Sequence, residues 1–332
     1  MRRLEQYWYS ISPLHLVLWP LSLFFGLVAA LRRALYRSGA LQVTRLPVPV
    51  VVVGNISVGG AGKTPLVIWL ARLLRERGFA PGLVSRGYGG IANSPQQATA
   101  ASDPRVVGDE TVLLARRCGC PVWVGANRAA AARALLAANP ECNVIISDDG
   151  LQHYALARDA EIVVIDGERG FGNGMLLPAG PLREARWRLD NVDALVVNGA
   201  ALFPRETLPA GVPAFDMTLA GRTFYDLLNP QLQVEPAYFA GQNVHAVAAI
   251  GNPQRFFNHL RELGLSFTAH PYPDHHAFEA PDFTFDKNDR VIMTEKDAVK
   301  CERFCNENFW ALRVDVETDP ALGELVLQKI GS

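Results

Sequence analysis

The chain has 332 residues, of which 49% are hydrophobic and 20% are charged, so it can bury a large core and is not mainly disordered. Its length predicts about two domains. Its formal net charge of -1 provides no overall basic field for nucleic acid, although the first 50 residues carry six arginines, Arg2 and Arg3 among them, against a single glutamate.

The first predicted element is an apolar helix over residues 16–31, a run without any charge. At 1.5 Å per residue this run would be about 24 Å long, shorter than the roughly 30 Å hydrocarbon core of a bilayer. Arg32, Arg33 and Arg37 follow and can meet anionic headgroups. These features favour a helix that lies in, or is partly inserted into, the cytoplasmic leaflet. A buried core helix and a cleaved signal peptide are the alternatives, although no clear cleavage site follows the run.

Beyond this segment, predicted strands and helices alternate, as they do in a doubly wound parallel α/β sheet. Residues 48–53 are a valine-rich run typical of a strand buried on both faces, and residues 65–77 have helical spacing. The other predicted strands are residues 80–85, 121–124, 143–147, 161–165, 194–198, 244–250 and 290–294, and the other predicted helices are residues 128–138 and 320–330.

The predicted elements divide the chain into four segments. The glycine- and proline-rich passage 167–181 interrupts the alternation and is interpreted as a linker or an active-site loop. The segments are an N-terminal helical segment (1–38), a first α/β domain (39–182), a second, smaller α/β domain (183–319), and a C-terminal helix (320–332).

The residues after the valine-rich strand match a phosphate-binding loop. Gly62, Lys63 and Thr64 fit the end of the pattern G-x-x-x-x-G-K-[ST], while Ser57 replaces its first glycine. In such a loop, backbone N–H groups hold phosphate oxygens, Lys63 reaches the β- and γ-phosphates of ATP, and Thr64 ligates Mg²⁺. A glycine-rich turn that binds nothing is the alternative. The predicted nucleotide-binding residues are Ser57, Val58, Gly59, Gly60, Ala61, Gly62, Lys63 and Thr64.

Two carboxylates follow the predicted strand 143–147. Asp148 or Asp149 is expected to meet the Mg²⁺ shell, directly or through water, as a Walker-B acid does. Two strand-end turn residues are the alternative. Gln152 and His153 come next and are candidates to contact the substrate at the same edge of the sheet.

Several other polar residues have a plainer interpretation. Asp109 precedes an apolar helical run and by itself is typical of a helix N-cap. His275 and His276 are adjacent in a loop without further metal ligands, so they do not indicate a zinc site. The spacing of the five cysteines fits neither a disulfide framework nor a zinc site, which favours a reducing compartment. They are Cys118, Cys120, Cys142, Cys301 and Cys305.

Eight features, taken in order, resemble one family. They are the apolar basic N-terminus, G-N-x-x-x-G-G-x-G-K-T-P, S-R-G-Y, V-G-D-E, D-D-G-L-Q-H, L-P-A-G-P-L-R-E, P-D-H-H and T-E-K-D-A-V-K. Up to about Lys300, the chain is similar to tetraacyldisaccharide 4′-kinase, the lipid A 4′-kinase of bacteria with an outer membrane. Thr111 departs from the family pattern, in which proline commonly follows V-G-D-E.

The resemblance implies ATP-dependent phosphorylation of the 4′-hydroxyl of a tetraacylated glucosamine disaccharide 1-phosphate, giving lipid IVA. It also implies Mg²⁺, a location at the cytoplasmic face of the inner membrane, peripheral or monotopic, and two α/β domains with the active site between them. Asp109 would be the base for the attacking hydroxyl, helped by His275. Asp148 and Asp149 would serve the metal, and Arg183 would approach the phosphates on closure. Neither a nucleic acid nor an obligate protein partner is expected.

Two other classes of function remain open on the sequence. A membrane-associated P-loop ATPase or GTPase would act as a switch, although the N-K-x-D run usual for guanine specificity is not found. A membrane-tethered binding module would hold nucleotide without turnover, and its carboxylates would be dispensable. Only a kinase would form phosphorylated lipid together with ADP.

Overall fold

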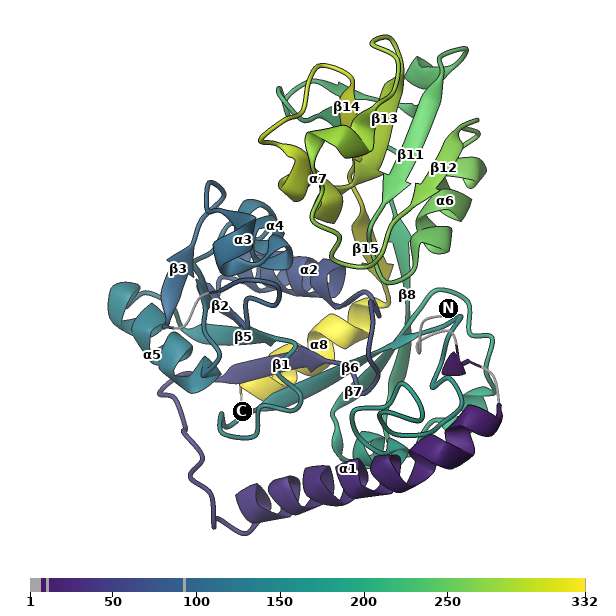
Figure 1. The fold of residues 1–332 in the computed structure, drawn as a ribbon. Helices are drawn as coiled ribbons and strands as arrows, with labels where there is room; N and C mark the ends of the chain where they lie inside the picture. The colour runs from purple at the N-terminus through teal and green to yellow at the C-terminus, as the bar shows by residue number, and fades with distance from the viewer. Residues whose placement is uncertain (1–6, 10–11, 92–93, 332) are drawn as a thin grey trace.

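The computed structural model describes residues 7–9, 12–91 and 94–331, so Arg2 and Arg3 of the basic N-terminus lie outside the described residues. Figure 1 shows two α/β bodies, one above the other, with a long helix along the base of the larger one. Each body has its own sheet, which confirms the predicted α/β class with a larger and a smaller unit.

The larger body is built on a nine-stranded sheet in the order β15-β8-β7-β6-β1-β5-β2-β4-β3. Neighbouring strands from β4 to β8 are parallel, and the two edge strands β3 and β15 pair antiparallel. The strands are β1 (Val50–Gly54), β2 (Pro81–Ser85), β3 (Gln96–Ala98), β4 (Val122–Val124), β5 (Val144–Asp148), β6 (Ala160–Asp166), β7 (Ala194–Asn198), β8 (Ala214–Ala220) and β15 (Asp315–Thr318).

Helices cover both faces of this sheet and bury its apolar side chains. One core gathers α2, α4 and α8 around residues such as Leu70, Val112 and Leu322, and the other packs Leu135 of α5 against the opposite face. This two-sided burial explains why the central strands are continuous apolar runs. The helices are α2 (Lys63–Glu76), α3 (Pro104–Val107), α4 (Asp109–Arg117), α5 (Arg128–Ala138) and α8 (Pro320–Ile330), with 3₁₀ turns at Arg186–Asn191 and Arg205–Thr207.

The smaller body has a six-stranded sheet in the order β10-β9-β14-β13-β11-β12, in which β11 to β14 pair parallel. Its core is rich in aromatic residues, with Phe224, Phe257 and Trp310 fully or almost fully buried. Its elements are β9 (Phe224–Asp226), β10 (Gln233–Val234), β11 (Val244–Ala248), α6 (Pro253–Glu262), β12 (Thr268–Pro271), β13 (Arg290–Thr294), α7 (Glu295–Cys301) and β14 (Phe309–Leu312), with 3₁₀ turns at Pro236–Phe239 and Ala280–Phe283.

The division between the two sheets differs from the predicted boundary after residue 182. The prediction that residues 194–198 belong to the second unit is wrong, because β7 pairs parallel with β6 and continues the large sheet. Strands β8 and β15 pair with each other at the edge of that sheet and connect it to the smaller body (Figure 1). The passage 167–181 is not a linker between sheets, since it returns to the phosphate-binding loop, where Val58 N donates to Pro181 O at 2.8 Å.

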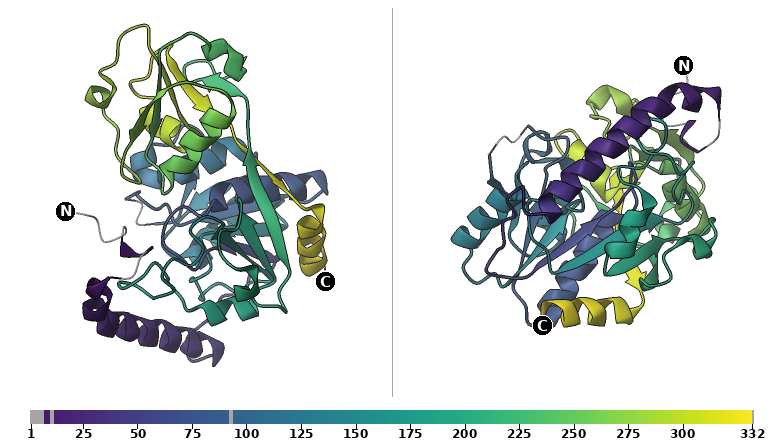
Figure 2. Two further views of the ribbon diagram at one scale, coloured as in Figure 1. Left: turned by 90° about the vertical axis from the view of Figure 1, so that its right-hand side faces the viewer. Right: turned by 90° about the horizontal axis from the view of Figure 1, so that it is seen from below.

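Helix α1 (Pro13–Arg37) lies along the large body, on the side remote from the small one (Figures 1 and 2). Ser12 caps its N-terminus and Pro13 occupies the first turn, where a missing N–H costs nothing. The helix is long and apolar enough to cross a membrane by length and composition, with a mean hydropathy of 2.1 over 18 residues. Only 11% of that window is buried, so the interpretation as a core helix is wrong.

Candidate active site

The phosphate-binding loop joins β1 to α2 in the arrangement that the motif predicts. Gly62 precedes the first residue of α2 at a φ of 93°, and a side chain there would collide with the amide of Asn198. That amide donates to Ala61 O at 3.0 Å, so the end of β7 helps to fix the loop. The N-terminal end of α2 therefore opens at Lys63 and Thr64, where free N–H groups can bind phosphate.

Lys63 lies in a cluster of opposite charges beside the loop. Its Nζ is 3.4 Å from Asp149 Oδ1, and Arg183 Nη1 donates to Asp149 Oδ1 and Oδ2 at 3.1 and 3.0 Å. Although burial alone would raise the pKa of Asp149, Lys63 and Arg183 bring it below its ordinary value. The site thus holds two cations around one carboxylate, and both can turn to an incoming phosphate group.

Asp148 presents the atom best suited to a cation. Its Oδ2 accepts from Ser85 Oγ at 3.2 Å, whereas its buried Oδ1 has no partner among the described residues. Burial, with the nearby carboxylates of Glu110 and Asp149, raises the pKa of Asp148 to about 7. A divalent cation would relieve both effects. No three acidic, histidine or cysteine side chains of the described part of the chain form a metal cage, so Thr64, phosphate oxygens and water would complete an Mg²⁺ shell.

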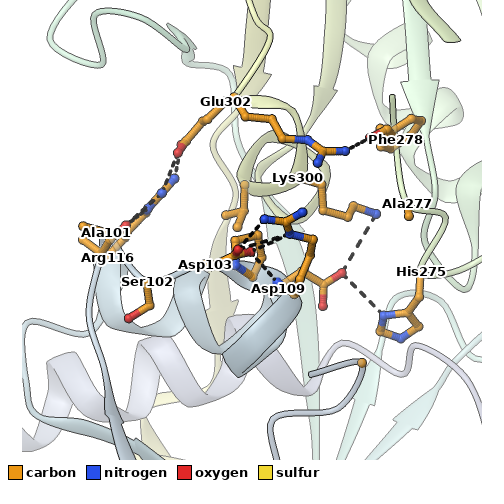
Figure 3. Close-up of a pocket in the computed structure, with 16 residues that line it drawn as sticks. Ala101, Ser102, Asp103, Asp109, Arg116, His275, Ala277, Phe278, Lys300 and Glu302 are labelled. Atoms are coloured by element: carbon orange, nitrogen blue, oxygen red, sulfur yellow. Dashed lines mark hydrogen bonds and ion pairs between the residues drawn. The ribbon is translucent and has the colours of Figure 1, made fainter. Parts of the chain in front are cut away.

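Asp109 of the larger body and His275 of the smaller body lie next to each other (Figure 3). Asp109 Oδ2 lies 3.4 Å from His275 Nδ1 and 3.9 Å from Lys300 Nζ, in a side chain that is only 7% exposed. Burial opposes ionisation of Asp109, but the hydrogen bond from His275 and the charges of two lysines lower its pKa to about 2. Asp109 in turn raises the pKa of His275. Gly108 is the N-cap of α4, so the interpretation of Asp109 as the cap is wrong.

Lys296 also belongs to this cluster, although no role was predicted for it from the sequence. Its Nζ donates to Glu110 Oε1 at 2.9 Å and lies 3.4 Å from both Asp274 Oδ1 and His275 Nε2. Lys296 and Lys300 are four residues apart on α7, so both reach the same face of the helix. That spacing within T-E-K-D-A-V-K was the available signal, but only the tertiary structure brings it to Asp109.

A cavity of about 370 Å³ lies beside Asp109, between α4 and α7. Asp109, His275 and Lys300 line one part of it, and an ion pair between Arg116 and Glu302 lies at another (Figure 3). This volume lies at the lower end of the range for small-molecule sites. The cavity therefore leaves room for a polar group next to the carboxylate.

Gln152 and His153, the predicted substrate contacts, lie at the carboxyl end of β5 but differ in their surroundings. Gln152 Nε2 donates to Asn55 O at 3.1 Å and to Glu184 Oε2 at 2.9 Å, so its amide supports the phosphate-binding loop. His153 Nε2 is buried without a partner in the described part of the chain. Burial and the charges of Arg128 and Arg158 lower the pKa of His153 to about 4, so the ring is neutral at pH 7.

Both the sequence and the fold of this chain match those of known proteins. The family model for tetraacyldisaccharide-1-P 4′-kinase matches residues 14–331, so the similarity continues past Lys300. Curated tetraacyldisaccharide 4′-kinases of Methylobacillus flagellatus and of an Azoarcus species are 52% and 51% identical, over 99% and 98% of this chain and 96% and 94% of theirs. A crystal structure of LpxK from Aquifex aeolicus in complex with ATP matches with a TM-score of 0.80 and 28% identity, covering 96% of this chain and 99% of the other.

Proposed function

The chain belongs to the tetraacyldisaccharide-1-P 4′-kinase family, and we propose that it performs the family's reaction with the residues gathered around Asp109 and the phosphate-binding loop. It is a kinase that transfers the γ-phosphoryl group of ATP to the 4′-hydroxyl of a tetraacylated glucosamine disaccharide 1-phosphate, which yields lipid IVA. The observation that carries the assignment of roles is the meeting of Asp109 and His275 at the interface between the bodies. An ATPase or GTPase switch is not favoured.

The loop and its cations would hold the ATP phosphates. The N-terminal N–H groups of α2 and the ammonium of Lys63 would face the β- and γ-phosphates, and Arg183, which binds Asp149 in this structure, would turn to the transferred group. Thr64, Asp148 and Asp149 are the residues that would hold Mg²⁺, which neutralises phosphate charge when bound. Positioning and charge stabilisation of this kind are most of what phosphoryl transfer requires.

Asp109 would accept the proton of the attacking hydroxyl. The bond from the 4′-oxygen to the γ-phosphorus forms, the bond from that phosphorus to the oxygen of ADP breaks, and the hydroxyl proton passes to the carboxylate. His275 holds the carboxylate in place through Nδ1, and the nearby lysines keep it ionised. A base positioned in this way contributes roughly 10²–10⁴-fold.

The kinase assignment is tested by measuring ADP and phosphorylated lipid together. We expect one phosphorylated lipid for each ADP formed, and little ADP when the glycolipid is left out. Equal rates of ADP formation with and without glycolipid would instead identify a switch ATPase.

Helix α1 would hold the enzyme at the cytoplasmic face of the inner membrane. Its exposed apolar side chains include Val17 and Phe24, at 72% and 65% exposure. Arg32 and Arg37 are exposed near its C-terminal end and can meet anionic headgroups, whereas Arg33 is buried and does not fit that expectation. The double change Val17→Glu and Phe24→Glu is therefore expected to release the protein from anionic phospholipid vesicles in a sedimentation assay. Removing residues 1–31 should do the same.

Thermal unfolding gives the control for this prediction. Because α1 buries little of its surface, the Tm of the remaining α/β core should change by only a few degrees. A truncated chain that unfolds at a much lower temperature, or a double variant that still sediments with vesicles, would contradict the membrane role.

Lys296 would fix the two bodies relative to each other beside the pair of Asp109 and His275, called the dyad from here on. It bridges Glu110 of α4 to the loop that carries His275, so Lys296→Gln is expected to lower kcat about tenfold while Lys296→Arg keeps most of it. Loss of the ammonium should also raise the pKa of His275, which NMR titration can follow, because the lysine charge opposes protonation of the ring. An unchanged kcat and an unchanged pKa would remove Lys296 from the mechanism.

A further inference from the structure

A second cavity lies between α1 and the segment 176–187, apart from the cavity beside Asp109. It has a volume of about 330 Å³, and its walls are mainly apolar, with Leu23, Leu27, Leu176 and Trp187 among them. None of the residues that line this cavity, called the groove from here on, is assigned to proton or phosphoryl transfer.

One buried cation lines the groove. Arg33 is only 6% exposed, its guanidinium lies 4.8 Å from the centre of the Trp187 ring, and its Nη1 has no hydrogen-bond partner in the described part of the chain. A buried N–H donor without an acceptor is costly, and a guanidinium can only donate. The groove therefore offers a hydrogen bond to an acceptor on a ligand whose remainder is apolar.

The groove opens on the exposed face of α1, and hydrogen bonds link its opposite wall to the residues around the phosphate-binding loop. Leu23 and Leu27 line it while staying 54% and 66% exposed, so its mouth is continuous with the apolar surface of the helix. Glu184 lies in its wall and accepts from Gln152, which also donates to Asn55 at the start of the loop. The neighbouring residue, Arg183, binds Asp149. The wall of the groove therefore includes Glu184, the chain neighbour of the arginine that is proposed to meet the transferred phosphate.

We propose that this groove holds one acyl chain of the tetraacylated acceptor, with Arg33 donating a hydrogen bond to the carbonyl oxygen of that chain. The inference rests on the proposed function. An acyl group combines an apolar chain with a carbonyl acceptor, which is the combination that the groove and Arg33 match. Anchoring one chain also fixes the disaccharide relative to the loop, so less orientational freedom is lost when the hydroxyl reacts.

Filling the groove is the first test. Ala30 lines it on α1, so Ala30→Trp should raise the KM for the glycolipid about tenfold and leave the KM for ATP and the kcat at saturating glycolipid near those of the original enzyme. Val28→Trp places the same ring on an exposed part of α1 outside the groove and should leave all three constants near their original values. Equal effects of the two variants, or none, would overturn the proposal.

Photo-crosslinking is the second test and does not depend on turnover. A tetraacyldisaccharide 1-phosphate with a diazirine on an acyl chain, presented in phosphatidylcholine vesicles, should label residues 176–187, and Arg33→Met should reduce the labelling. Labelling confined to the outward face of α1 would overturn the proposal. So would equal labelling of residues 176–187 by a diazirine phosphatidylcholine, since the groove would then bind membrane lipid. Absence of phosphorylated product from the original enzyme would contradict the proposed function instead.

Discussion

Replacing Lys63 with alanine is expected to lower kcat by roughly 10²–10³-fold. The Lys63 ammonium lies at the first turn of α2, 3.4 Å from Asp149, where it can follow the charge that moves onto the leaving phosphate during transfer. Since this charge is greatest in the transition state, the loss should appear mainly in kcat. Steady-state turnover at saturating ATP and glycolipid, together with circular dichroism of the variant, provides the measurement.

Arg72 supplies a matched control for this experiment. It is also a cation on α2, but its side chain is 47% exposed and pairs with Asp315 at the edge of the sheet. Arg72→Ala should keep kcat within about twofold of the original. A folded Lys63→Ala enzyme with near-normal kcat would contradict the assignment of the phosphate-binding loop.

Asp109→Asn and His275→Ala are each expected to reduce kcat by about 10²–10⁴-fold. The double variant should have a kcat only slightly below that of the less active single variant. Asp109 Oδ2 and His275 Nδ1 come from opposite bodies and lie 3.4 Å apart, so the proposed base and its positioning group each need the other. Residues that act as one unit give strongly non-additive free-energy losses. The test is a double-mutant cycle on kcat with the glycolipid as acceptor.

His276 is the control for the dyad because it is adjacent to His275 but pairs with Asp282 at 3.0 Å instead. His276→Ala should therefore leave kcat close to the original. If the losses from Asp109→Asn and His275→Ala simply add, the two residues act independently. A loss of less than about tenfold from Asp109→Asn would move the search for the base to Asp148, Asp149 and His153.

The same pair has a signature in pH titration. The hydrogen bond to Asp109 is the main cause that raises the pKa of His275, so NMR should find a lower pKa for His275 in Asp109→Asn. The free energy of unfolding should depend on pH in the direction that a raised histidine pKa requires. The stabilisation from a raised histidine pKa is fully present below the ordinary value near 6.5 and is lost as the pH rises through the folded pKa.

The features of this protein that depend on neighbouring residues alone could be predicted from its sequence. The valine run and the Gly62-Lys63-Thr64 turn specify a buried strand, a tight loop and a helix start, and the structure places β1 and α2 there. The helices at 128–138 and 320–330 have the predicted bounds, since their periodicity and caps are local. The order of the motifs also identified the family, which the comparisons confirm.

Which strands share a sheet, and which side chains meet, could be seen only in the folded chain. Strand β7 has the same local pattern as β11, so its place beside β6 follows from non-local pairing that no single segment encodes. Asp109 comes close to His275 and Lys300 because α4 packs on α7 across two bodies. Arg33 and Trp187 come together only because α1 folds back on the segment 176–187. Such contacts depend on how whole elements pack, and a one-dimensional pattern carries little information about packing between distant segments.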